Sequence, residues 1–218
     1  MLDAPVLTAR HLLTAIEAVA TVAFALSGLL EAARKKLDAV GVCVVAGLAA
    51  FGGGTLRDVL LDRRPFFWVE HATWLWALLA MCIAAMLFLR ARHIAPTDRA
   101  MQWPDAIGLG LFTASGTQLA LSQHMPGIVA VLMGVISAVF GGVLRDIVCN
   151  EIPSAFRDRR PYAVCSFFGG WAVVAAQSLH TPDWVGLSAA CVTATGLRAL
   201  ALATGFALPG WRPERPDA

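Results

Sequence analysis

The feature that most constrains this chain is a succession of long apolar runs separated by short polar segments. A helix that crosses the hydrocarbon core of a bilayer needs about 20 predominantly apolar residues. Reading the runs between breaker residues predicts seven such helices, at residues 8–33, 37–62, 68–90, 104–122, 126–150, 161–180 and 183–207. Composition agrees, because 58% of the residues are hydrophobic and only 15% are charged, which is too apolar for a water-soluble domain. We therefore expect an all-α integral membrane protein, with residues 1–218 in a single membrane domain.

The loops between the predicted helices alternate in their content of Lys and Arg. One side holds Arg34, Lys35, Lys36, Arg90, Arg92, Arg99, Arg157, Arg159, Arg160, Arg212 and Arg215. The other side holds only Arg10, Arg63 and Arg64. Because basic residues accumulate on the cytoplasmic side, this asymmetry predicts an extracytoplasmic N-terminus and a cytoplasmic C-terminus in the inner (plasma) membrane of the cell.

The chain contains an internal repeat. Sliding it against itself by 88 positions, without a gap, aligns residues 53–58 (Gly-Gly-Thr-Leu-Arg-Asp) with residues 141–146 (Gly-Gly-Val-Leu-Arg-Asp). The same shift aligns Glu17 with Asp105, Phe24 with Phe112, Ser27-Gly28 with Ser115-Gly116 and Pro65 with Pro153. Each copy, residues 8–90 and 104–180, holds three predicted helices, so the second copy enters the membrane from the opposite side. This predicts two inverted three-helix repeats, with the seventh helix, residues 183–207, outside them.

Glycines interrupt the apolar pattern of the second and the fifth predicted helix. They are Gly52, Gly53, Gly54, Gly141 and Gly142. Inverted repeats built around interrupted helices are typical of transport proteins, so we predict that these glycines and Thr55 line a path through the membrane. Phe140 stands where a third glycine of the second copy would be, and either reduces the bend or forms an apolar constriction. The alternative is close packing, because small residues let membrane helices approach each other.

Four charged residues follow the glycines inside the apolar runs, namely Arg57, Asp58, Arg145 and Asp146. Near the centre of a membrane helix each charge costs about 2.5 to 3.5 kcal/mol on insertion scales. The repeat favours intramembrane pairs between the copies, Arg57 with Asp146 and Arg145 with Asp58. The alternative is that each residue lies near a helix end and reaches separately to the membrane surface.

Further polar residues occupy the first and the fourth predicted helix. Glu17 lies deep in its helix and is a candidate to face the path and attract cations. Asp105 follows Pro104 and is a candidate to cap its helix instead. Ser27 and Ser115 are candidates to line the path, although a serine hydroxyl can equally bond to its own helix backbone.

The sequence carries no signal for an enzyme, a metal site or a nucleic-acid partner. The motifs of hydrolases, P-loop proteins and zinc proteases are absent, and the five cysteines lie in apolar runs without a CxxC pair. A net charge of +2 is too small to favour nucleic acid. We expect no catalytic residue, no metal and no cofactor beyond a permeant potassium or sodium ion, and we expect the lipid bilayer and monovalent cations as partners.

The repeated Gly-Gly-x-Leu-Arg-Asp, together with residues 24–28 (Phe-Ala-Leu-Ser-Gly) and 151–153 (Glu-Ile-Pro), resembles a known family. It is similar to the prokaryotic trimeric intracellular cation (TRIC) channels, whose bacterial members are often described as glycine-transporter-domain proteins. The resemblance extends over about residues 10 to 205. It implies a homotrimer of seven-helix protomers, each with a potassium-permeable pore lined by the glycine-kinked second and fifth helices. The basic residue that animal relatives carry in the fourth helix has no evident match here.

Two functions are open at the level of sequence. The first is a monovalent-cation channel, in which backbone carbonyls and hydroxyls partly replace the hydration shell of the ion. The second is a secondary transporter for glycine or another small zwitterion, in which Glu17 or Asp58 holds the amine or a proton. An inert membrane scaffold would leave the duplicated buried charges unexplained.

Overall fold

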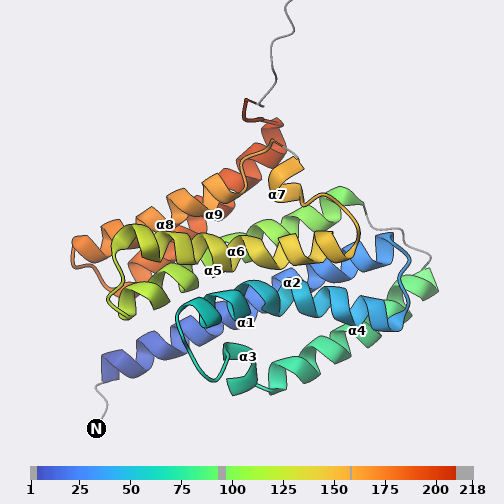
Figure 1. Cartoon of the computed structure of the whole chain (residues 1–218), viewed down its shortest axis with the longest axis horizontal. Helices are drawn as coiled ribbons and strands as arrows, with labels where there is room; N and C mark the ends of the chain where they lie inside the picture. Colours follow the sequence, from blue (N-terminus) through green and yellow to red (C-terminus); the bar gives the residue numbers. More distant parts are fainter. Residues whose placement is uncertain (1–3, 93–96, 158, 210–218) are drawn as a thin grey trace, which may run out of the picture.

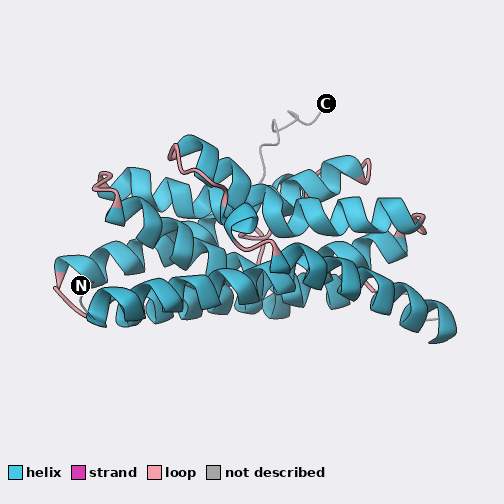
Figure 2. Ribbon diagram, turned by 90° about the horizontal axis from the view of Figure 1, so that it is seen from below, coloured by secondary structure: helices cyan, strands magenta, loops and turns pink. Residues whose placement is uncertain are grey.

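The structure of the protein is a computed structural model that describes residues 4–92, 97–157 and 159–209. This part of the chain consists of helices and loops, and Figure 2 shows no strand in it. The long helices are α1 (Ala4–Arg34), α2 (Ala39–Leu60), α4 (Thr73–Arg92), α5 (Asp98–Ser122), α6 (Gly127–Val148), α8 (Ala163–Ser178) and α9 (Asp183–Thr204). Two four-residue helices, α3 (Phe67–Glu70) and α7 (Ser154–Arg157), follow α2 and α6. Arg212 and Arg215, which contributed to the predicted orientation, lie outside the described residues.

The predicted helices match the long helices at most ends, with two informative differences. The helix predicted over 68–90 is divided into α3 and α4. The prediction missed the turn at His71 because the apolar run continues on both sides of it. The helix predicted to begin at residue 104 begins at Asp98, where Thr97 caps it by accepting a hydrogen bond of 3.3 Å from the backbone N–H of Ala100. A side-chain cap of this kind satisfies a backbone donor that the first helical turn leaves unpaired.

Much of the outer surface is apolar. Trp76, Leu87 and Val192 are 74%, 67% and 72% exposed. Within the residues that the structure describes, four helical segments can cross a membrane by length and composition, namely His11–Arg34 of α1, and α2, α6 and α9. Thr73–Phe88 and Ala163–Ser178 are shorter apolar helices. Exposed apolar side chains are stable where the surrounding medium is lipid, and helices satisfy their own backbone hydrogen bonds there. The protein is therefore an all-α, multi-pass membrane protein.

The two copies of the repeat form one bundle. In Figure 1, α4 lies at the lower edge and α8 and α9 lie at the upper edge, with α1, α2, α5 and α6 between them. The inner helices pack across the two copies, α2 against α6 and α1 against α5. Phe24 on α1 stacks on Phe112 on α5, its counterpart in the repeat, with ring centroids 5.7 Å apart. The centre of the bundle is thus made by equivalent elements of both copies.

Contacts between the copies are reciprocal. Gly53 lies against Ser137, and Gly141 lies against Ala49. Gly141 is the counterpart of Gly53 in the repeat and Ser137 is the counterpart of Ala49, so the second contact is the first with the two copies exchanged. Later residues of α2 meet earlier residues of α6, which makes the two helices antiparallel. Reciprocal contacts of this kind are produced by a two-fold axis. The two copies are therefore inverted repeats, and α9 lies outside them.

The turns repeat in the same way as the helices. Lys36 and His124, which follow α1 and α5, have φ angles of 55° and 60°. Asp62 and Asn150, which follow α2 and α6, have φ angles of 50° and 56°. Each pair is separated by 88 positions, so the backbone conformation confirms the alignment that the sequence predicted.

The glycines do not interrupt the helices, so the predicted breaks at residues 52–54 and 141–142 are wrong for this conformation. α2 is helical from Ala39 to Leu60, and α6 is helical from Gly127 to Val148. A helix in a membrane keeps its backbone hydrogen bonds because lipid offers no replacement. The missing side chains serve close approach instead, since a Cβ atom on Gly53 or Gly141 would overlap a backbone carbonyl oxygen of the facing helix.

The packing role of these glycines predicts a difference between two alanine variants. We expect Gly53→Ala to lower the free energy of unfolding by about 1 to 3 kcal/mol, because backbone atoms of Ser137 would have to move. Gly196 on α9 is the matched control, because nothing lies within 4 Å of a Cβ atom built there. Thermal unfolding of the purified variants measures the difference. Equal melting temperatures for Gly53→Ala and Gly196→Ala would contradict the packing role.

Candidate functional site

The first buried charge cluster consists of Glu17, Arg57 and Asp58. Nη1 of Arg57 donates to Glu17 on α1 over 2.6 Å, and Nη2 and Nε donate to one carboxylate oxygen of Asp58 over 2.7 and 2.9 Å. The other oxygen of Asp58 accepts a hydrogen bond of 2.8 Å from the backbone N–H of Phe67, at the start of α3. All three charged side chains are buried, so the cluster ties α1, α2 and α3 together inside the bundle.

The second buried charge cluster consists of Asp105, Arg145 and Asp146. Arg145 donates to Asp105 on α5 over 2.8 Å through Nη1 and to Asp146 over 2.8 Å through Nε. The other oxygen of Asp146 accepts a hydrogen bond of 2.8 Å from the backbone N–H of Ser154, at the start of α7. The three members of this cluster stand 88 positions after those of the first, so the repeat extends to the chemistry of the buried groups.

The predicted pairing between the copies, Arg57 with Asp146 and Arg145 with Asp58, is wrong. Each arginine is held by the aspartate that follows it and by an acidic residue on the first helix of its own copy. A guanidinium offers five N–H donors, so one carboxylate leaves an edge free for a second. The alternative of separate contacts with the membrane surface also fails for Arg57 and Asp58, which are fully buried.

Asp105 is a member of the second cluster and does not cap its helix. It is 4% exposed, and α5 begins at Asp98, well before it. Pro104 therefore lies inside α5, whereas the prediction placed it at the helix start. Glu17, its counterpart, occupies the predicted deep position on α1 and is likewise buried.

The two clusters carry more negative than positive charge. Each holds two carboxylates and one guanidinium, and hence one net negative charge when all members are ionised. Charge inside a membrane protein is stable only where it is paired or meets water or an ion. An excess of buried negative charge therefore favours cations over anions nearby.

The serines of the two copies have different environments. Ser27 accepts a hydrogen bond from Nη1 of Arg145, and its hydroxyl lies 3.4 Å from a carboxylate oxygen of Asp105. Its counterpart Ser115 is 1% exposed, and its hydroxyl oxygen has no hydrogen-bond partner. The two serines are thus equivalent in the sequence, but only the hydroxyl of Ser27 has a hydrogen-bond partner.

A polar cavity of about 440 Å³ lies beside the first cluster. Its wall includes Glu17 from α1, Ser115 from α5, and residues of the segment after α2, namely Arg63, Glu70 and His71. The cavity is next to the N-terminal half of α1, which the predicted orientation places on the extracytoplasmic side. Two of the predicted path residues thus belong to the wall of one cavity.

An ion pair lies at the opposite end of the bundle. Lys35 at the end of α1 contacts Glu151 after α6, and Arg157 lies 3.2 Å from the same carboxylate. The Lys35 ammonium holds the pKa of Glu151 below its usual value. The residues 88 positions away from Lys35 and Glu151 are Gln123 and Arg63, which cannot form such a pair. The two ends of the bundle therefore differ, because the ion pair at one end has no equivalent at the matching positions of the other.

The predicted path glycines lie at or near the contact of α2 with α6. Gly53 and Gly141 are buried in it, and Gly52 faces the side chain of Leu144. Gly54 instead faces the ring of Phe67, while Gly142 faces the hydroxyl of Tyr162 and the second cluster. The glycines that meet in the contact thus separate the two charge clusters.

Two predicted path residues face elsewhere. The hydroxyl of Thr55 donates to the carbonyl oxygen of Phe51 over 2.7 Å and accepts from Nε1 of Trp68 over 3.0 Å, so its polar atom is satisfied locally. Phe140 is 37% exposed, at a spacing of four residues from the half-buried Ile136 and of eight from the exposed Leu132. This stripe is an outer face of α6, so Phe140 does not form the predicted constriction.

Sequence reasoning missed Tyr162. It is buried beneath Arg198, whose guanidinium carbon lies 4.8 Å from the ring centroid, and Arg198 donates over 3.1 Å to the carbonyl oxygen of Pro161. Arg198 had no predicted partner, and these contacts supply a ring and a backbone acceptor. The position of Tyr162 next to Pro161, before an apolar run, carries no signal of this packing.

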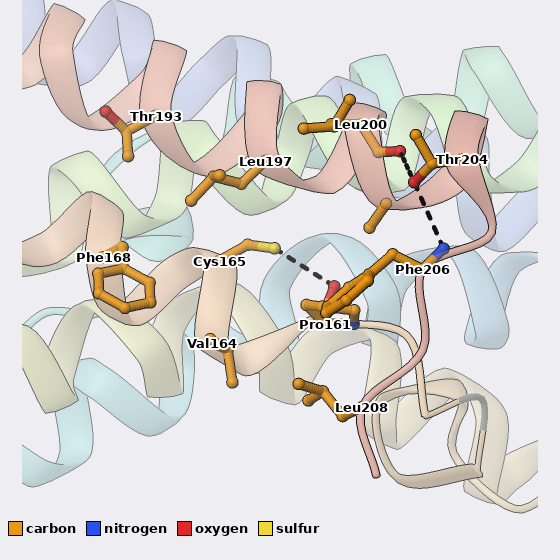
Figure 3. A pocket seen from close by; sticks show the side chains of 11 residues that line it. Pro161, Val164, Cys165, Phe168, Thr193, Leu197, Leu200, Thr204, Phe206 and Leu208 are labelled. Atoms are coloured by element: carbon orange, nitrogen blue, oxygen red, sulfur yellow. Dashed lines mark hydrogen bonds between the residues drawn. The ribbon is translucent and has the colours of Figure 1, made fainter.

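A second cavity, of about 880 Å³, lies between α8, α9 and the segment that follows α9 (Figure 3). Figure 3 shows Phe168, Leu197, Leu200, Phe206 and Leu208 around it. Among the described residues, none of those in its wall is charged. An apolar space of this kind suits a hydrocarbon chain and is unsuited to a hydrated ion.

The fold and the two clusters define the class of this molecule, a multi-pass helical membrane protein made of inverted repeats with buried ionised groups. The sequence profile of the family described as "Glycine transporter" matches the chain twice, at residues 14–90 and 102–178. Each match covers one copy of the repeat.

Curated relatives are similar over most of the chain. A UPF0126 membrane protein of Vibrio cholerae is 38% identical over 164 residues, which cover 73% of this chain and 66%, just under two thirds, of that protein. The UPF0126 inner membrane protein YadS of Escherichia coli is 35% identical over 170 residues, which cover 76% of this chain and 78% of that protein.

Solved structures share the fold. The TRIC trimeric intracellular cation channel orthologue from Rhodobacter sphaeroides superposes with a TM-score of 0.82 and 34% identity, over 89% of this chain and 99% of that chain. A structure described as the basis for conductance through TRIC cation channels superposes with a TM-score of 0.81 and 32% identity, over 92% of this chain and 97% of that chain. The chain belongs to the family that unites the UPF0126 membrane proteins with the TRIC channels, as its repeated motif predicted.

A double-mutant cycle tests the pairing within each copy. We expect Arg57→Gln to cost about 3 to 5 kcal/mol, because it leaves buried carboxylates without their partner. Glu17→Gln should then add much less than it costs alone, giving a coupling energy above about 1 kcal/mol. Asp146→Asn is the control, and its effect should add to that of Arg57→Gln within about 0.5 kcal/mol. Unfolding free energies in detergent measure both cycles; coupling to Asp146 without coupling to Glu17 would restore the pairing between copies.

Proposed function

We propose that this protein is a monovalent-cation channel, permeable to potassium, with one pathway in each protomer. The observation that carries the proposal is the pair of buried clusters, each with one net negative charge, on the two sides of the contact between α2 and α6. Such clusters lower the energy of a cation in the membrane and raise that of an anion. Family membership supports the proposal, because similar solved structures are described as TRIC cation channels.

The proposed pathway leads from the cavity at Glu17 and Ser115, past the glycine contact, to Ser27 and the second cluster. In this conformation the contact closes it, because Gly53 and Gly141 lie directly against the facing backbones. Opening separates α2 from α6 at this point. Few side chains interdigitate between backbones that glycines bring together, so a small shift of the helices admits water and an ion.

We further propose that the channel is a homotrimer in the inner (plasma) membrane, with its N-terminus outside and its C-terminus in the cytoplasm. The relatives that support this location and assembly are the inner membrane protein of Escherichia coli and the trimeric channel orthologue of Rhodobacter sphaeroides. The exposed stripe of α6 that includes Leu132 and Phe140 offers an apolar face for contact with lipid or with another protomer. The Lys and Arg content of the loops supports the orientation.

Purified protein in a planar bilayer distinguishes the channel from the alternative of a secondary transporter for glycine or another small zwitterion. We expect discrete unitary currents in potassium chloride, with a reversal potential near that of the cation under a salt gradient, because the buried clusters select against chloride. Gly196→Ala should conduct like the unaltered protein, since nothing lies within 4 Å of a Cβ atom built on that glycine of α9. Saturable glycine uptake by proteoliposomes, without unitary currents, would favour the transporter.

A further inference from the structure

We propose that the cavity beside the first cluster holds one monovalent cation, bound by the carboxylate of Glu17 and the hydroxyl of Ser115. The cavity has a volume of about 440 Å³, enough for an ion with part of its hydration shell, and both residues belong to its wall. The site itself follows from the geometry, while its role as an entry site for permeation rests on the proposed function.

The charge around the cavity favours a cation. The buried first cluster holds two carboxylates, those of Glu17 and Asp58, and one guanidinium, that of Arg57. Arg63 at the cavity wall is shared between Glu70, at 3.5 Å, and Asp58, at 3.8 Å. The buried carboxylate of Glu17, which belongs to the cavity wall, therefore attracts a cation.

The hydroxyl of Ser115 supplies the independent observation. Ser115 belongs to the wall of the cavity, and its buried hydroxyl oxygen has no hydrogen-bond partner. Buried polar atoms normally have one, so an unpartnered hydroxyl oxygen in a cavity wall that also contains a carboxylate indicates a missing ligand. A hydroxyl oxygen and a carboxylate oxygen are both hard donors of the type that alkali cations accept.

The second cluster shows what such a ligand would replace. There, Ser27 contacts the positively charged Nη1 of Arg145, which also contacts Asp105. At the first cluster, Arg57 contacts Glu17, but the equivalent serine, Ser115, has no such contact. A cation between Glu17 and Ser115 would take the position, relative to Ser115, that a guanidinium nitrogen of Arg145 has relative to Ser27.

The ligand set favours a monovalent over a divalent ion. Arg57 already engages Oε1 of Glu17, which leaves the second carboxylate oxygen and one hydroxyl for the ion, with water for the remainder. Calcium sites generally use six to eight oxygen ligands, including several carboxylates. One carboxylate oxygen and one hydroxyl oxygen match a partly hydrated potassium or sodium ion.

Equilibrium binding of radioactive rubidium, as the probe for potassium, to the purified full-length protein in detergent tests the site. We expect saturable binding that potassium displaces and that falls at least tenfold in Ser115→Ala, which leaves every ion pair of the first cluster in place. Ser122→Ala is the matched control on α5, because its exposed hydroxyl only bonds back to Leu119, and it should bind like the unaltered protein. Glu17→Asp, which keeps the charge but shortens its reach, should also weaken binding.

The outcomes separate the site from the channel. Unchanged rubidium binding in Ser115→Ala, or no saturable binding in the unaltered protein, would overturn the site, while unitary currents in bilayers would still support the channel. Conversely, binding that depends on Ser115 in a protein without currents would support the site and overturn the channel. Because binding is measured in detergent, it requires no open pathway.

Discussion

The close contact between α2 and α6 determines how the rest of the molecule is arranged. Gly53 and Gly141 bring the two backbones together, and the two-fold relation makes the helices antiparallel. One turn further along each helix, Arg57 and Arg145 are thereby carried into the interior on opposite sides of the contact. A side chain larger than hydrogen at either glycine would meet the backbone of the facing helix.

Burial of the arginines in turn explains the surrounding architecture. Each guanidinium uses its fork of donors to hold two carboxylates, one from its own helix and one from the first helix of its copy. The free oxygens of Asp58 and Asp146 then accept from the first backbone N–H groups of α3 and α7. The short helices stand where they do because an aspartate at their N-termini satisfies donors that a helix start leaves unpaired.

The apolar runs and the composition were enough to predict the membrane class and the approximate helices, and the repeated motif was enough to predict the inverted repeats and the family. It could not predict which charges pair, because an alignment shows which residues are equivalent and says nothing about which ones touch. Glu17 and Asp105 each lie 40 positions from their arginine, and only the packing of α1 on α2 and of α5 on α6 brings them together. The effect of the glycines was also beyond the sequence, because the same residues permit either a break or a close approach.

The difference between the two serine environments could not be predicted from the sequence for a similar reason. Ser27 and Ser115 are identical in type and position, so no local signal separates them. Residues outside the motif also differ: Lys35 and Glu151 pair at one end of the bundle, whereas Gln123 and Arg63 occupy the equivalent positions at the other. The two ends of a duplicated fold are therefore not equivalent in their polar contacts.

Locking α2 to α6 tests most directly whether their glycine contact is the closed point of an ion pathway. In a variant without the five native cysteines, Gly52→Cys and Leu144→Cys place two thiols at this contact, since a Cβ atom at position 52 would lie 2.6 Å from a terminal carbon of Leu144. The oxidised protein, with the cross-link verified by mass spectrometry, should give no unitary potassium currents in a bilayer, and a reductant should restore them. Currents of the same amplitude and frequency before and after reduction would show that ions pass elsewhere.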